Sequence, residues 1–447
     1  MSALLALALA AAGAGAARAA DLSSVTAAAL ARSPAAAEAR ARRAQAAAAG
    51  REAYWSRWPR LSARASALRG DDPLFAFGAL LQQRRVAAAD FDPAALNHPG
   101  YRTFVNGALE VGVPLFTGFE LSRAAALAAL AAEEAEAMGG AAAQAVRLRA
   151  ADACLLELRA RELLSELDAR IASAGAAVEA AERLKKQGLV LGSDHQAALA
   201  ALSGLRAWRA RVAAEREANR AGLGVLLGGP VPDIAGRLRD WSPALEDDET
   251  LVAAALSASP DLRVAGLRVR AAGVRRGGAR GGVLPRVDAF AAVNSAADGL
   301  SSVAASRLVG VRASVLFGDA AYSSRVARAE ADMSAAVAAG AGVEDAARGE
   351  ILARAAGIRG LNAALPELRE ALARARDSLA RVRPLYREGR QSVLDVLRAE
   401  EAVARLEEAR LEAAYRQRTE WAALRAAQGR LDADAVAALA GSLEEPR

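Results

Sequence analysis

The chain has little of the side-chain chemistry on which most enzymes depend. Its 447 residues include one cysteine, Cys154, and two histidines, His98 and His195. A single cysteine excludes an internal disulfide framework and a four-thiolate metal site, and neither histidine has a second histidine or a cysteine at ligand spacing. The sequence also has no phosphate-binding glycine loop and no nucleophile elbow. We therefore expect no cofactor, no metal and no catalytic residue, and an enzyme is the least favoured class.

Aromatic residues are scarce, at 4% of the chain, although 53% of it is hydrophobic. Alanine and arginine dominate instead, and both are strong helix formers, so the composition favours long helices over a compact aromatic core. The net charge is +6, but the arginines alternate with glutamates and no block of about five or six like charges occurs. This pattern indicates solvated helix surfaces rather than a nucleic-acid partner.

After residue 20 the chain also lacks any apolar run long enough to cross a membrane as a helix. Residues 1–20 are apolar, and Ala17, Arg18 and Ala19 have the A-x-A form of a cleavage site. We expect a signal peptide at 1–20 and export of the remainder. A short membrane anchor is the alternative, and it is disfavoured because the run is short and rich in glycine.

Internal repetition is the strongest positive signal. Two glycines and an aspartate of the first half recur 201 positions later, so that Gly188, Asp194 and Gly228 correspond to Gly389, Asp395 and Gly429. The apolar heptad spacing of residues 164–181 recurs at 365–382 with the same shift. Closer to the N-terminus the shift is 226, which relates Ser33-Pro34 to Ser259-Pro260. So many shared shifts indicate a duplication.

The two repeats are expected at residues 21–230 and 246–431, with a linker at 231–245 and a tail at 432–447. Each repeat begins with a helical stretch and continues through two short strands into a very long helix, a glycine break and a returning helix. The helical stretches are expected at about 22–57 and 246–282, the long helices at 118–187 and 319–388, and the returning helices at 194–227 and 393–430. Apolar spacings of three and four over such lengths predict coiled-coil-like hairpins forming an α-barrel.

Four short segments alternate between apolar and polar residues, as β-strands do. They lie at about 58–68, 104–114, 284–294 and 307–316. Their polar side is expected to carry Arg60, Arg64, Asn106, Glu110, Arg286, Asp288 and Arg312. Each segment has about the length of a tilted membrane-spanning strand, although four half-buried strands of a soluble sheet are the alternative.

The repeat leaves two possible registers for the last strand. A shift of 201 pairs Phe116 with Phe317, whereas a shift of 200 pairs Gly118 with Gly318. We prefer 200, because the other register would turn every side chain of that strand to the opposite face. One residue is then inserted between this strand and the following helix.

Four strands cannot close a barrel, and lipid does not tolerate open sheet edges. The smallest membrane barrels have about eight strands. If these strands span a membrane, the chain must therefore self-associate, and three copies would supply twelve strands. The expected fold is mainly α, with four strands per chain that contribute to a twelve-stranded β-barrel in a trimer.

The sequence resembles the TolC family of trimeric outer-membrane efflux proteins over residues 22–431. The resemblance rests on VPLFTGF (113–119) at the strand exit, the loop segment 72–100, and the hairpin turns GLVLGSDHQAALAAL (188–202) and YREGRQSVLDVLRAEEAV (386–403). It implies a passive conduit of an efflux or type I secretion system, located in the outer membrane with a large periplasmic part. A periplasmic adaptor and an inner-membrane pump would be its partners, and the polar strand face would line the barrel lumen.

The resemblance also implies roles for the two hairpin turns. Gly188, Leu189 and Gly389 would form the tip that the adaptor grips. At the gate, Tyr386 and Asp194 would form a locking pair and Asp395 would line the pore. This chain departs from the family pattern with Gln391 in place of an arginine of the lock, and with Arg398 in place of a second aspartate. Arg398 could neutralise Asp395, which puts a cation-selective constriction in doubt.

Helix ends at these turns can be predicted from residue type. The two turn glycines tolerate the left-handed conformation that ends a helix, and Ser193 or Asp194, and Ser392, can cap the returning helices. Pro366 and Pro384 stand where the first repeat has Ser165 and Arg183. Since proline removes a helical hydrogen bond and usually kinks a helix, we expect the second hairpin to be the moving one.

Two other classes remain open. One is a non-conducting coiled-coil scaffold of the cell envelope, and the other is a periplasmic adaptor, which also carries helical hairpins. Adaptors lack the duplication and the two pairs of strands, so the 201-residue repeat favours the conduit. The sequence does not identify the transported cargo.

Overall fold

A computed structural model describes residues 20–298 and 304–444. The predicted signal peptide at 1–20 lies outside these residues apart from Ala20. Among the described residues, a helical unit consists of 20–41, 135–265 and 339–444, and a strand unit consists of 42–134, 266–298 and 304–338. Four helices begin in one unit and end in the other.

Each repeat opens with two helices rather than one. These are α1 (Leu22–Arg32) and α2 (Pro34–Trp55) in the first repeat, and α7 (Asp248–Ala258) and α8 (Pro260–Arg280) in the second. Ser33 and Ser259 separate them with extended ψ angles of 123° and 124°, because a following proline disfavours the helical conformation. The helical stretches expected at about 22–57 and 246–282 are therefore each interrupted at these serines.

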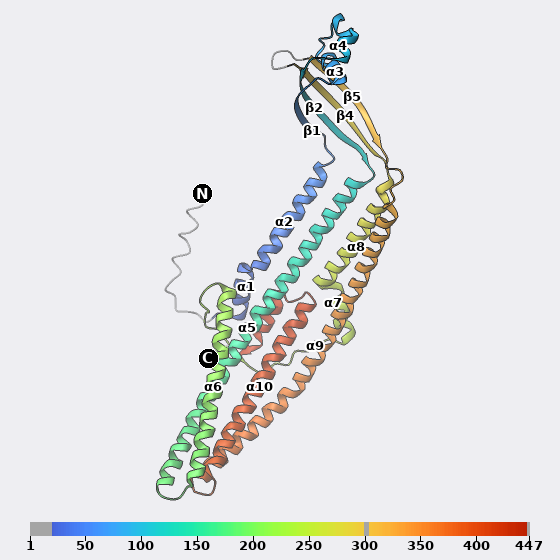
Figure 1. Ribbon diagram of the computed structural model, residues 1–447. Helices are drawn as coiled ribbons and strands as arrows, with labels where there is room; N and C mark the ends of the chain where they lie inside the picture. Colours follow the sequence, from blue (N-terminus) through green and yellow to red (C-terminus); the bar gives the residue numbers. More distant parts are fainter. Residues whose placement is uncertain (1–19, 299–303, 445–447) are drawn as a thin grey trace. The chain divides into compact units, whose positions relative to one another are not determined.

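Two long helical hairpins follow, one in each repeat (Figure 1). The first consists of α5 (Glu120–Lys186) and α6 (Gly192–Leu227), and the second of α9 (Tyr322–Arg387) and α10 (Val393–Ala427). Their turns lie at the same end of the helical unit. Pro366 and Pro384 lie inside α9 without ending it.

The helical unit is held together by an apolar core between these helices. Leu155 and Leu158 of α5 are fully buried there with Ile358 of α9 and Leu411 of α10. Cys154 is buried beside them, and burial raises the pKa of its thiol to about 12. Its thiol is therefore inert at neutral pH.

The linker and the tail are both part of this unit. In the tail, α11 (Ala433–Gly441) is followed by β6 (Leu443–Glu444), which pairs with β3 (Arg237–Leu238) of the linker. Arg418 of α10 is completely buried and donates to the carbonyl oxygens of Arg239 at 2.7 Å and Ser442 at 2.8 Å. Burial lowers the pKa of Arg418 to about 10, so it remains charged at neutral pH while it joins the two segments.

The strand unit contains one antiparallel sheet in the order β1-β2-β4-β5. Its strands are β1 (Arg60–Gly70), β2 (Arg102–Thr117), β4 (Arg286–Ala297) and β5 (Ala304–Ser314). The segment between β1 and β2 contains α3 (Pro73–Gln83), the 3-10 helix η1 (Ala88–Phe91) and α4 (Pro93–Asn97), and a short 3-10 helix, η2 (Gly281–Val283), precedes β4. The strands have two ends. We call the end at which β1 connects to β2 the loop end of the sheet, and the end at which the strands join α2, α5, α8 and α9 the helix end.

The two outermost strands of this sheet, β1 and β5, each pair on one side only within the described chain. No helix of the described residues is long and apolar enough to cross a membrane.

Candidate functional site

The sheet carries its polar side chains on one face, as the alternation predicts. Residues that are direct partners in antiparallel strands point to the same side, and Ser62 faces Glu110, while Asp288 faces Arg312. All seven residues predicted for a lumen share this polar face: Arg60, Arg64, Asn106, Glu110, Arg286, Asp288 and Arg312. Arginines outnumber carboxylates among them, and Arg286 Nε lies 3.1 Å from Asp288 Oδ2.

The register also confirms the preferred shift of 200 between the strands of the two repeats. Val111 and Val311 both lie on the face opposite the polar one. Gly118 and Gly318 both have positive φ angles, 58° and 75°, where the chain leaves the sheet. The alternation of side chains therefore predicts the correct face of the sheet for these residues.

Within the described residues, nothing covers the opposite face of the sheet. Its large exposed hydrophobic side chains are leucine and valine: Leu61, Leu109, Val111, Val293, Val309 and Val311. Val309 is 80% exposed. Two arginines on this face, Arg69 and Arg307, lie toward the loop end. An apolar patch of this kind marks a surface that a membrane or another protein chain covers.

Aromatic side chains gather at the helix end of the same sheet, a feature that our sequence analysis missed. Trp55 and Trp58 precede β1, Phe119 follows β2 and Phe317 follows β5, and each is at least half exposed. Rings at the ends of membrane-spanning strands form the interfacial girdles of outer-membrane barrels. Their concentration at strand ends, in a chain with so few aromatics, was the available signal.

The two hairpin turns have the same backbone geometry. Gly188 and Gly389 have φ angles of 75° and 74°. In the first turn, Leu189 N–H donates to Leu184 O at 2.9 Å, and in the second Arg390 N–H donates to Leu385 O at 2.9 Å. These are the left-handed helix caps expected at the glycines.

The caps of the returning helices are only partly as predicted. Ser392 caps α10, and its hydroxyl accepts from Asp395 N–H at 3.2 Å. By contrast, α6 begins at Gly192, with Leu191 at the cap position and no side-chain bond. The prediction of Ser193 or Asp194 as the cap is therefore wrong, because the helix starts earlier and both residues lie inside its first turn.

The two tips differ in surface chemistry. The first presents Leu189 and Leu191, which are 71% and 69% exposed. The second presents Arg390 and Gln391, which are also exposed. Leu189 is thus accessible, as adaptor docking would require, and Leu191 is an apolar neighbour that our sequence analysis did not select.

Tyr386 is buried against the first hairpin. Its hydroxyl donates to Ala177 O of α5 at 3.2 Å, and burial raises its pKa. Within the described residues of one chain, no hydrogen bond joins Tyr386 to Asp194, and the locking pair implied by the resemblance stays a prediction for the assembled protein. The tyrosine instead packs with Val178 and Val396 in an apolar cluster that joins both hairpins.

Asp395 is engaged within its own helix. Its Oδ2 accepts from the Ser392 backbone N–H at 3.2 Å and from the Ser392 hydroxyl at 2.9 Å. Arg398 lies one turn further, with 3.6 Å between its Nη1 and Asp395 Oδ1. The carboxylate therefore has a cation beside it, as the departure from the family pattern predicted.

A buried charge cluster that our sequence analysis did not find lies farther along the hairpins. Glu400 of α10 is completely buried. Arg170 of α5 donates to it at 3.0 Å and Arg383 of α9 at 2.6 Å, and Ser173 of α5 also donates to it. Because α5 belongs to the first hairpin and α9 and α10 to the second, this cluster ties the hairpins together.

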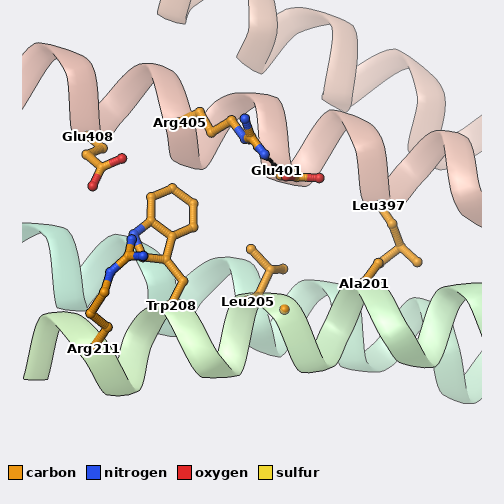
Figure 2. Close-up of a pocket in the computed structure, with 9 residues that line it drawn as sticks. Ala201, Leu205, Trp208, Arg211, Leu397, Glu401, Arg405 and Glu408 are labelled. Atoms are coloured by element: carbon orange, nitrogen blue, oxygen red, sulfur yellow. Dashed lines mark hydrogen bonds and ion pairs between the residues drawn. The ribbon is translucent and has the colours of Figure 1, made fainter.

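A hollow of about 500 Å³ lies between α6 and α10 (Figure 2). Leu205 and Trp208 of α6 face Leu397 and the Glu401–Arg405 ion pair of α10 across it. The Nε1 of Trp208 is buried and has no hydrogen-bond partner in the described part of the chain. None of the predicted tip residues lines this hollow.

Comparisons with known proteins give one family match and several solved structures of the same fold. Residues 251–430 match the family model described as outer membrane efflux protein. No curated protein matches the chain in sequence. Among solved structures, the outer membrane protein VceC of Vibrio cholerae has a TM-score of 0.75 at 22% identity, over 91% of this chain and 96% of that one.

Two further channels share the fold. The CmeC outer membrane channel of Campylobacter jejuni has a TM-score of 0.78 at 16% identity, over 95% of this chain and 90% of that one. The open state of the MtrE outer membrane channel of Neisseria gonorrhoeae has a TM-score of 0.72 at 17% identity, over 92% and 89%. The resemblance to TolC-family outer membrane efflux proteins is thus confirmed by the family match over residues 251–430. The solved outer-membrane channels share the fold over most of the chain.

Proposed function

We propose that three copies of this chain form the passive outer-membrane conduit of a tripartite efflux or type I secretion system. The β-strands of the three copies would close into one twelve-stranded barrel, and the helical hairpins would form a periplasmic α-barrel. A periplasmic adaptor and an inner-membrane pump would supply the energy and the opening signal. The family match supports an efflux channel, and the assembly and its gating are our proposal.

The observation that carries the proposal is a two-faced sheet with two open edges. One face bears arginines and carboxylates, and the other bears exposed leucine and valine. In lipid every backbone N–H and C=O must be paired, so β1 and β5 need partners. Pairing β1 of one copy with β5 of the next satisfies both edges and turns the apolar faces outward together.

In the proposed conduit the hairpin tips would form the gate. Tyr386 lies in the last turn of α9, Gln391 lies in the second hairpin turn, and Asp194, Asp395 and Arg398 lie in the first two turns of α6 and α10. Gly188, Leu189 and Gly389 form the exposed turn surfaces on which we propose that the adaptor docks. The Asp395–Arg398 pair argues against a strongly cation-selective constriction.

Neighbouring residues on the same strand provide a direct test. Ser62 and Leu61 are both exposed in the single chain, but they lie on opposite faces of β1. We would replace each with cysteine, as Ser62→Cys and Leu61→Cys, and add a charged, membrane-impermeant maleimide to outer-membrane vesicles. The native Cys154 is buried and stays silent.

The conduit predicts that Ser62→Cys reacts from the water-filled lumen and that Leu61→Cys is protected by lipid. Detergent-denatured samples serve as the control. Unfolding also exposes Cys154, so each denatured variant should take up one maleimide more than the denatured natural chain. Equal labelling of both cysteines in intact vesicles would contradict the proposal and favour a soluble scaffold or adaptor.

A further inference from the structure

The helix α3 lies on the polar face of the sheet, at the loop end (Figure 1). Its Ala79 is buried together with Phe104 of β2 and Ala296 of β4. Phe104 faces Leu68, and Ala296 faces Asn106, so these contacts lie on the face that carries Glu110 and Arg64. The helix therefore covers the end of the proposed lumen surface rather than the lipid-facing surface.

Hydrogen bonds hold α3 to three strands. The side-chain amide of Gln83 is buried and donates to Thr103 O at 2.9 Å and to Ala297 O at 3.0 Å. The next residue, Arg84, donates to Ala305 O at 2.8 Å. Since β2, β4 and β5 all take part, α3 is fixed in place on the sheet and is not a loose loop.

The side of α3 that points away from the sheet is also apolar. We call Leu74, Gly78 and Leu81 the free stripe; their spacing of four and seven places them on one side of a helix. Phe77 lies on the same side but packs edge-on against Phe91, with 5.6 Å between the ring centroids. Leu74 is 83% exposed and Leu81 is 53% exposed. The buried side consists of Ala76, Ala79, Leu80 and Gln83. A helix that is apolar on both sides is normally buried on both.

We propose that the free stripe of α3 packs against the same stripe of the other two copies, around the three-fold axis at the loop end of the barrel. This inference rests on the proposed trimeric conduit and adds a contact to it. The partner is a second copy of this chain, and the contact narrows the mouth of the conduit. Lipid is a poor partner for the stripe, because lipid would lie against the opposite face of the sheet.

The dimensions of a barrel support this contact. Twelve strands spaced about 4.8 Å apart and tilted by about 40° close into a cylinder of about 24 Å backbone diameter. A helix with its side chains is about 10 Å wide, and three such cylinders side by side fill a circle of about 22 Å. Three α3 helices packed on the inner wall therefore have no room to remain apart.

Cysteine cross-linking tests the contact. We would purify the Leu81→Cys protein as its detergent-solubilised oligomer and add an oxidant. A disulfide requires the two Cα atoms to lie within about 7 Å, so it forms only where the helices meet. Three thiols at one axis can form one disulfide, so two of every three chains should run as a covalent dimer.

The matched control is Gln82→Cys. Gln82 is also exposed, but it lies about 100° around the helix from Leu81, away from the free stripe. It should give little dimer under the same conditions. The mass of the particle is measured for both variants, and neither change removes a buried contact of the single chain.

Dimer with Leu81→Cys and little with Gln82→Cys in a trimeric particle would support the inference. No dimer with either variant, or equal dimer with both, in a trimeric particle would overturn it and leave the conduit intact. If the particle is monomeric, the proposed conduit itself fails, and the inference fails with it.

Discussion

Glu400 is the residue whose charge is most fully enclosed by its partners. Its carboxylate is completely buried and receives bonds from Arg170, Ser173 and Arg383. Removing one partner of a buried ion cluster typically costs about 3–5 kcal/mol. Without Glu400, Arg170 would keep Glu166 at 3.1 Å and the partly exposed Arg383 would be solvated, so we expect the low end of that range. The polar contact between the two hairpins at this level therefore depends on the carboxylate of Glu400.

We therefore predict that Glu400→Ala lowers the free energy of unfolding by about 3 kcal/mol. The neighbouring Glu401 pairs only with Arg405 on the exposed surface, and Glu401→Ala should cost less than about 1 kcal/mol. Thermal unfolding followed by helical circular dichroism compares the two. Equal losses in the two variants would show that the cluster contributes no special stability.

Glu162 gives a prediction about pH. It lies on α5, its Oε1 accepts from Leu238 N–H at 2.7 Å, and burial raises its pKa above the usual 4.5. The folded chain then holds a proton that the unfolded chain has released, so stability falls as pH rises through the folded pKa. Glu162→Gln keeps an acceptor but carries no charge, and the variant should gain stability relative to the natural chain from pH 4.5 upward.

Asp168 serves as the control, because its pKa is shifted in the opposite direction to that of Glu162. Its hydrogen bond from Arg209 lowers its pKa, so its contribution to stability is present at neutral pH and is lost as pH falls through the folded pKa. Asp168→Asn should therefore lose stability relative to the natural chain as pH rises from the acid range. Unfolding temperatures between pH 3 and 7 test both; parallel curves for Glu162→Gln and the natural chain would refute the burial argument.

At the scale of elements, the repeat was the most informative part of the sequence. It located both hairpins, both turn glycines and the four strands, because glycine conformation and strand alternation are local properties. It did not reveal that linker and tail pair as β3 and β6, since a two-residue strand has no readable period. The breaks at Ser33 and Ser259 were visible as Ser-Pro pairs but were treated only as markers of the repeat.

Some features of the candidate sites could likewise be predicted from local sequence, whereas others depend on tertiary packing. The faces of the seven polar strand residues follow from parity, and the Ser392 cap follows from residue type. The Glu400 cluster could not be foreseen, because Arg170 and Ser173 lie 230 and 227 residues away in sequence and only tertiary packing brings them together. The Tyr386 contact with Ala177 is likewise a property of how two hairpins pack.

Pro384 offers a test of which hairpin moves. It lies inside α9 four residues before Glu388, whose N–H donates to Pro384 O at 3.0 Å. Proline removes one helical hydrogen bond at its own nitrogen, which makes the helix easier to bend. We predict that Pro384→Ala stiffens the second hairpin near its tip and lowers the open probability of the channel, measured as single-channel conductance events.

Pro366→Ala is the matched control, since this proline is also inside α9 but farther from the turn. It should change the open probability less than Pro384→Ala. Unchanged transport and conductance in Pro384→Ala would count against the second hairpin as the moving element.

At the scale of the whole molecule, the proposed conduit requires an assembly, because the described part of a single chain leaves two strand edges and an apolar sheet face without partners. The same chain supplies long hairpins whose turns are equivalent in the two repeats. A closed trimer satisfies the edges, covers the apolar face with lipid and brings six hairpins together. The proposed gate at the hairpin tips, the narrowed mouth of the barrel and the adaptor and pump partners all depend on this assembly.

The most direct test is the mass of the particle extracted from the outer-membrane fraction with detergent, together with its single-channel conductance. For a trimeric conduit we expect a particle of three chains, each of 46.0 kDa before removal of the predicted signal peptide, with a small, gated conductance. A monomer recovered from the soluble periplasmic fraction would contradict it, and the chain would then be a scaffold or an adaptor.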